Sequence, residues 1–143
     1  GVPEVFPLNK TLTSLTGQQL ALTVEFCANP AASHVVWLTP SKAMLPGDFS
    51  GLLWAQPLTA GSSPHCQQAA LMMRVVTLDD EGEYVFVVRS PRGLAEGTIT
   101  LNVTHASSFS VPAARAYHMS AALSLLVVAL TLPQFYIKQT ICV

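Results

Sequence analysis

The sequence predicts an all-β domain of two packed sheets, followed by a polar stalk and an apolar C-terminal segment. Short runs of alternating apolar and polar residues indicate strands, because successive side chains of a strand point to opposite faces. Clusters of Gly, Pro, Ser and Asn separate these runs, and no stretch before residue 110 has a useful helical period. Many short strands separated by turns are typical of a two-sheet sandwich.

The expected strands occupy residues 1–104. Scattered apolar residues and two prolines over 1–16 predict edge strands, because proline cannot donate a hydrogen bond to a neighbouring strand. Strict alternation predicts a half-buried strand over 20–26, and a short apolar run predicts another over 34–38. A weak strand is expected near 51–54, in a stretch rich in Pro, Gly and Ser. The last three expected strands are marked by Leu71, Met73 and Val76, by Tyr84, Phe86 and Val88, and by the alternation over 97–103.

The segment from Asp80 to Tyr84 places Asp, Gly and Tyr at alternate positions. Asp80 can hydrogen-bond nearby backbone and Gly82 accepts a positive φ at little cost, so both residues suit a tight turn. A tyrosine directly after such a turn has the form of a tyrosine corner, in which its hydroxyl bonds back to the backbone. We therefore expect Tyr84 to begin a buried strand and to close the turn before it.

On these residues the chain resembles the I-set domains of the immunoglobulin superfamily over about residues 5–104. Gly17, Leu20 and Leu22 lead to Val24, which stands where the family has its first cysteine. Trp37 follows 13 residues later, the family's usual separation. The other matches are the pattern of Leu71, Met73 and Val76 and that of Gly93, Ala95, Gly97, Ile99, Leu101 and Val103. The resemblance implies an immunoglobulin-like two-sheet sandwich.

The sequence departs from the family at the disulfide that usually joins strands B and F across the sheets. Val24 and Phe86 replace its two cysteines and fill the space beside Trp37 with hydrocarbon. A disulfide contributes about 2–4 kcal/mol, and burying a Phe and a Val contributes roughly 1.5–3 kcal/mol each. The resemblance also makes strands B and E neighbours, and so implies a disulfide between Cys27 and Cys66. The alternative is two unpaired thiols.

Two glycosylation sequons favour an extracellular protein: Asn9-Lys10-Thr11 and Asn102-Val103-Thr104. Asn102 alternates with residues expected to face inward, so its side chain should face solvent, as a glycan requires. An oxidising compartment would also permit the expected disulfide. The chain begins at Gly1 rather than Met, which fits either a removed signal peptide or a piece of a longer protein.

The composition changes after residue 104. Residues 105–118 predict a stalk, residues 119–137 form a mostly apolar segment, and residues 138–143 would form a tail. The apolar segment fits the signal for a glycolipid (GPI) anchor, with Ser107 and Ser108 as the attachment site. It also fits a transmembrane helix, although its most apolar part is short for a span of about 20 residues, or a segment packed on the domain. Either anchor would hold the domain at the outer face of the plasma membrane.

The composition does not indicate an enzyme or a nucleic-acid-binding protein. The net charge is −1, only 10% of residues are charged, and no cluster of Lys or Arg is present. The four His are scattered, and the sequence has no spacing typical of a catalytic or zinc site. The acidic residues around Asp79 could suggest calcium, but a solvated turn is the better interpretation. We expect no catalytic activity, no cofactor and no metal.

Without a chemical site, the expected function is recognition of another protein by a surface. The resemblance implies a role in cell adhesion, with another cell-surface protein as the homophilic or heterophilic partner. Alternation places Val85, Val87 and Arg89 on the outer side of their strand, as an apolar patch of the kind that marks an interface. Trp54 is a further candidate for this face, and the alternative is that it packs under the strand expected nearby. The alternative is a non-binding membrane-proximal spacer, or a truncated form of a longer immunoglobulin-superfamily protein.

Overall fold

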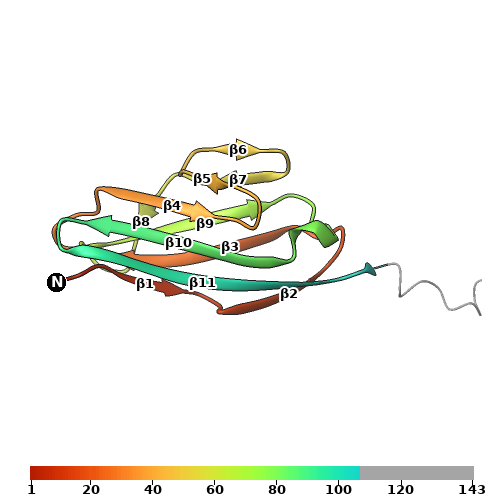
Figure 1. The fold of residues 1–143 in the computed structure, drawn as a ribbon, viewed down its shortest axis with the longest axis horizontal. Helices are drawn as coiled ribbons and strands as arrows, with labels where there is room; N and C mark the ends of the chain where they lie inside the picture. Colours follow the sequence, from red (N-terminus) through yellow and green to blue (C-terminus); the bar gives the residue numbers. More distant parts are fainter. Residues whose placement is uncertain (107–143) are drawn as a thin grey trace, which may run out of the picture. The chain divides into compact units, whose positions relative to one another are not determined.

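The computed structural model describes residues 1–106, and its strands form two sheets that enclose one core (Figure 1). The strands are β1 (Glu4–Pro7), β2 (Thr11–Leu15), β3 (Leu20–Cys27), β4 (His34–Leu38), β5 (Ala43–Met44), β6 (Phe49–Ser50), β7 (Leu53–Ala55), β8 (Thr59–Ala60), β9 (Cys66–Met73), β10 (Gly82–Ser90) and β11 (Gly93–Thr104), and a 3-10 helix η1 (Leu78–Asp80) precedes β10. The first sheet has the order β1-β3-β9-β7-β6, with β8 also pairing with β9, and the second has the order β2-β11-β10-β4-β5. The expected all-β sandwich is confirmed.

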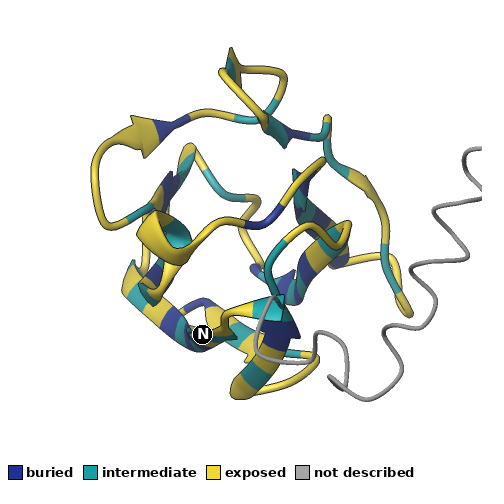
Figure 2. Cartoon of the chain, turned by 90° about the vertical axis from the view of Figure 1, so that its right-hand side faces the viewer, coloured by how far each residue is buried: buried dark blue, intermediate teal, exposed yellow. Residues whose placement is uncertain are grey.

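Alternate residues of the long strands form the core between the sheets. Buried and more exposed residues alternate along β3 and β10, and this striping is visible along the strands in Figure 2. The ring of Phe86 lies at the centre, with its centroid 4.8 Å from that of Trp37 and 5.3 Å from that of Phe26. Val24 and Phe86, which stand where the resemblance places two cysteines, are both fully buried. Hydrocarbon therefore fills the space between the sheets at this level.

Tyr84, near the start of β10, bonds back to the preceding turn as the motif predicts. The Tyr84 hydroxyl donates a hydrogen bond to the backbone carbonyl of Asp80, with 2.5 Å between the oxygens. Burial, and secondarily the negative charge of Asp80, raises the pKa of Tyr84 well above its ordinary value. The Asp80 carboxylate accepts from the backbone N–H of Thr77 at 2.8 Å, which ties down the start of η1. Gly82 has φ 145°, a conformation that favours glycine.

The structure differs from the sequence expectation between residues 49 and 55. The sequence predicts a single weak strand near 51–54, but Gly51 and Leu52 form the turn of a hairpin between β6 and β7. Gly51 adopts φ 60°, which suits a tight turn and interrupts the strand. β11 also begins at Gly93 rather than at residue 97, because it pairs with β10 from that tight turn onward.

Gly1–His105 form one compact unit. Its buried residues form one hydrophobic cluster, so this unit has its own core and should fold alone. Within residues 1–106 no helix is long and apolar enough to cross a membrane. The expectations for most of the stalk, the apolar segment 119–137, the tail 138–143 and the attachment residues Ser107 and Ser108 lie outside the described residues.

Candidate protein-binding face

The outward side chains of β10 and of its two neighbouring strands form the candidate site, which we call the β10 face. Val85, Val87 and Arg89 alternate with buried residues of β10 and therefore point away from the core. Pairing with β4 and β11 arranges the face in three cross-strand rows: Leu38, Val85 and Thr98; Val36, Val87 and Glu96; and His34, Arg89 and Leu94. The first two rows place four apolar side chains side by side at the centre of the sheet.

Exposed leucines extend this apolar centre toward the edges of the sheet. Leu38 is 41% exposed, Leu45 is 55% exposed and Leu94 is 63% exposed, and their significance lies in adjoining the apolar centre. Leu45 follows β5 and borders a hollow of about 280 Å³, whose floor includes Val36 and Val87. The face therefore combines an exposed apolar side chain, Leu38, with a mostly apolar recess.

The three leucines were not identified from the sequence. Leu38 lies two residues after Val36 in β4 and so shares its outward side, which strand alternation alone could have shown. Leu45 could not be placed in this way, because its position depends on β5 pairing with β4 across an irregular loop. Leu94 belongs to the part of β11 that precedes the expected strand.

Trp54 does not belong to this face, which corrects the expectation from the sequence. It lies in β7, a strand of the first sheet, whereas Val85 and Val87 lie in the second. The Trp54 ring stacks on that of Phe49 across the β6–β7 hairpin, with 5.2 Å between centroids and 7° between planes. The two tryptophans thus have different surroundings, because Trp37 is fully buried between the sheets.

One end of the first sheet carries the disulfide. Cys27 and Cys66 stand directly opposite each other in the β3–β9 pair, and their sulfur atoms are bonded at 2.02 Å. The bridge therefore joins neighbouring strands of one sheet, and Val24 and Phe86 remain at the level of the usual inter-sheet bridge. The potential ligand atoms of Glu25, Cys27 and Cys66 lie close together. The two sulfur atoms are bonded to each other, however, so they are not thiolates that could bind a metal ion.

The Glu25 carboxylate forms hydrogen bonds to Ser62, in the loop next to the disulfide. Glu25 accepts hydrogen bonds from the hydroxyl of Ser62 at 2.5 Å and from its backbone N–H at 2.9 Å. These bonds lower the pKa of Glu25 below its ordinary value. A hollow of about 560 Å³ lies beside this loop, among residues such as Phe26, Leu58 and His65. Among residues 1–106 no carboxylate lines this hollow, so they supply it with no carboxyl group for acid–base chemistry.

Both sequons of the domain lie on its surface. Asn9 is exposed in the connection between β1 and β2. Asn102 is exposed on β11, opposite Thr13 of the neighbouring edge strand β2. Either side chain is accessible for glycosylation, and a glycan at Asn102 would lie near one edge of the second sheet, beyond the apolar centre of the β10 face.

Solved structures share this fold at low sequence identity. A chain of the complex of Dpr2 Ig1-Ig2 with DIP-Theta Ig1-Ig3 superposes with a TM-score of 0.61 at 19% identity, over 73% of this chain and 33% of that one. Titin M4 gives a TM-score of 0.54 at 20% identity, over 72% of this chain and 96% of that one. The titin M10 complex with obscurin-like 1 gives 0.53 at 19% identity, over 73% of this chain and 97% of that one. No family model and no curated protein matches the sequence. The fold is therefore that of immunoglobulin domains.

Proposed function

We propose that this immunoglobulin-fold domain is displayed on the outer side of a cell membrane and binds another cell-surface protein through its β10 face. The observation that carries this proposal is the row of outward apolar residues at the centre of the second sheet. Val36, Leu38, Val85 and Val87 adjoin one another there, and Leu38 is 41% exposed. Exposed, contiguous apolar residues with charges at their margins are typical of binding surfaces.

The disulfide and the exposed sequons support an extracellular location, and the fold supports binding to another protein. The domain contains a disulfide, which persists in oxidising compartments. Both sequon asparagines are exposed, as glycosylation requires. The fold is shared with a domain of the Dpr2 complex with DIP-Theta and with titin M10 in complex with obscurin-like 1, two protein–protein complexes. Attachment to the membrane rests on the sequence of residues 105–143, as either a GPI anchor at Ser107 or Ser108 or a single transmembrane helix.

Membrane attachment is tested by expressing the full chain behind a secretory signal in animal cells. Treatment of intact cells with phosphatidylinositol-specific phospholipase C should release a GPI-anchored domain into the medium. Retention in an alkali-resistant membrane fraction would instead identify a transmembrane helix. Asn9→Gln and Asn102→Gln should each remove one glycan, detected as a faster-migrating band. A chain that is secreted freely, or never leaves the cytosol, would contradict the proposed display.

Recognition by the β10 face is tested with fluorescent tetramers of the domain on a panel of animal cells. Leu38→Arg places a charge at the centre of the face, and Leu78→Arg is the matched control, because Leu78 is 51% exposed on η1 outside the face. We expect wild-type and Leu78→Arg tetramers to stain the same cells and Leu38→Arg tetramers to lose the staining. Equal staining by all three, or none by any, would favour the spacer role.

A further inference from the structure

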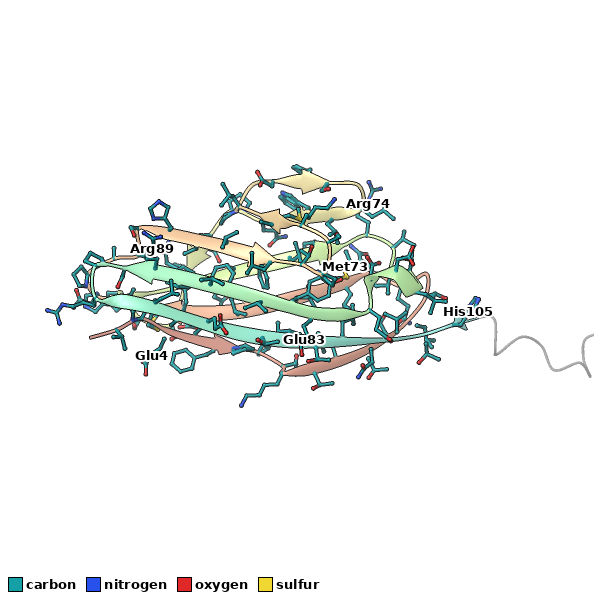
Figure 3. All side chains as sticks on the ribbon, in the orientation of Figure 1. Glu4, Met73, Arg74, Glu83, Arg89 and His105 are labelled. Carbon is teal, nitrogen blue, oxygen red and sulfur yellow. A yellow bond between two sulfur atoms is a disulfide. The ribbon has the colours of Figure 1, made fainter. Side chains whose placement is uncertain are left out.

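We propose that the partner of the β10 face is a second copy of this chain, packed face to face with its strands antiparallel. This inference rests on the proposed function, because it names the occupant of the same face. It starts from the charges of β10, which the apolar centre does not explain. Arg89 and Glu83 are the outward charged residues of this strand, and they lie on either side of Val85 and Val87 (Figure 3).

The two ends of the face carry opposite charge. Arg89 lies opposite His34 in the β4–β10 pair, and Arg92 lies in the turn that follows. The outward Glu96 lies one row closer to the centre, opposite Val87, so this end keeps a net basic charge. Glu83 lies at the other end, just after the acidic residues Asp79, Asp80 and Glu81. Lys42 is also near the acidic end, but its ammonium donates to the hydroxyl of Ser50, a residue of the first sheet.

Symmetry selects one arrangement of two such faces. A closed dimer has a two-fold axis, and for two sheets packed face to face this axis lies in the plane between them. An axis parallel to β10 would place Arg89 against the partner's Arg89. An axis that runs across the strands at Phe86 instead reverses β10, because Phe86 is the midpoint between Glu83 and Arg89. Arg89 then meets the partner's Glu83, and Glu83 meets the partner's Arg89.

The same two-fold rotation brings the exposed Leu38 side chain of one copy to the apolar recess of the other. Leu38 pairs with Val85, one residue from the axis on the acidic side. The two-fold axis carries it to the row one residue on the other side, which contains Val36 and Val87. These two residues and Leu45 border the hollow of about 280 Å³. The partner's Leu38 would therefore enter the hollow, and this fit does not depend on the charges.

The packing angle of sheets leaves both charge contacts within reach. Face-packed sheets cross at about 30°. Glu83 and Arg89 each lie three residues from Phe86, or about 10 Å along the strand. A crossing of about 30° displaces them sideways by about 5 Å, a distance that long side chains can span. Asn102 lies on the outward side of β11, beyond the row of Glu83 and Thr100, so a glycan there would flank the acidic end of the contact.

The size of the face sets the expected strength. Five strands about 4.8 Å apart and about seven residues long cover roughly 24 by 24 Å, on the order of 600 Å². This is less than the 800 Å² or so that each partner buries in a standard stable complex. The dimer should therefore be weak, with a micromolar or higher Kd in solution, and many copies on apposed membranes would strengthen the contact through multivalency.

Reversing the charge at Arg89 or at Glu83 by mutation tests the proposed dimer. Residues 1–106 are studied by sedimentation velocity from low to high micromolar concentration, as wild type, as Arg89→Glu, as Glu83→Arg, and as an equimolar mixture of the two variants. Each variant alone would place like charges together twice in its dimer, so its self-association should weaken about tenfold or more. The mixture should recover association, because the introduced carboxylate of one variant would face the introduced guanidinium of the other. Arg74→Glu, an exposed arginine after β9 in the first sheet, is the matched control and should dimerise as wild type does.

The outcomes separate the two proposals. A wild-type domain that stays monomeric at high micromolar concentration, or variants that associate as strongly alone as mixed, would overturn the second copy as partner. Neither result affects the tetramer experiment, in which loss of cell staining by Leu38→Arg alone would still support recognition of a different protein. Conversely, a dimer restored only in the mixture would support the homophilic contact even if the chain proves to be secreted.

Discussion

Replacing Cys27 and Cys66 together with alanine should lower the free energy of unfolding of the domain by about 4 kcal/mol. The bridge joins residues separated by 39 positions, and it restricts the unfolded chain accordingly. In the loop-entropy relation a loop of this length gives about 13 cal/mol/K, or about 3.9 kcal/mol at 25 °C. Domains of this size have a total stability of about 5–15 kcal/mol. The variant should thus remain folded but marginal.

Guanidinium denaturation of residues 1–106 measures this effect, with tryptophan fluorescence as the signal because Trp37 is fully buried. The midpoint should fall, and the dependence of the unfolding free energy on denaturant should steepen, because an unbridged unfolded chain exposes more surface. Wild-type protein unfolded in reductant is the control and should behave as the double variant does. Cys142 is absent from this fragment, so its reduction cannot contribute.

Two results would refute this reasoning. A loss below about 1 kcal/mol would show that the bridge restricts the unfolded chain far less than the loop-entropy relation requires. A large loss with an unchanged denaturant dependence would place the effect in the folded state, for example in the β3–β9 pairing that surrounds the bridge.

Three further predictions concern the core, a turn and a surface carboxylate. Phe86→Ala should cost about 3–5 kcal/mol in chemical denaturation, because it leaves a cavity beside two other aromatic rings; a cost below about 1 kcal/mol would contradict its central position. Gly82→Ala should destabilise more than Gly51→Ala, by roughly 1–3 kcal/mol, because a Cβ at Gly82 would lie 2.8 Å from a proline side chain while Gly51 has open space; equal thermal midpoints would argue against this close approach. Glu25 has a folded-state pKa below its unfolded value, so its contribution is present above that unfolded value, near pH 4.5, and is lost as the pH falls through the lower folded pKa. The stability difference between wild type and Glu25→Gln should therefore be larger at pH 7 than at pH 3, and a difference that grows toward acid pH would reverse the assigned sign.

The parts of the fold that could be predicted are those in which local pattern and packing agree. The strand over 34–38 matches β4, and 20–26 matches β3 within one residue, because alternation or apolarity continues to the ends of these strands. The tyrosine corner was predictable because its turn, its glycine and its tyrosine are close in sequence. Cys27 and Cys66 were paired only through the family resemblance, since strand alternation by itself does not identify neighbours across a sheet.

The β10 face could be predicted only in part. Its central residues follow from alternation in a single strand, whereas the contribution of Leu45 depends on how the chain returns from β4 to β5. Trp54 was misplaced for the same reason. The segment between β4 and β9 is rich in Pro, Gly and Ser and forms several strands of two or three residues, too short for a periodic signal. Side chains there are positioned by tertiary contacts such as the Phe49–Trp54 stack.

The parallel pairing of β2 with β11 has a mechanical consequence for a domain that is held at one end. Thr11–Leu15 run alongside Thr100–Thr104, while the N-terminus and the end of β11 lie at opposite ends of the domain (Figure 1). Tension applied between these ends would slide β2 and β11 along each other, so that their inter-strand hydrogen bonds share the load together and do not open one after another. Force applied at the two ends of the domain would thus load this pair of strands in shear, the direction in which a strand pair resists rupture best.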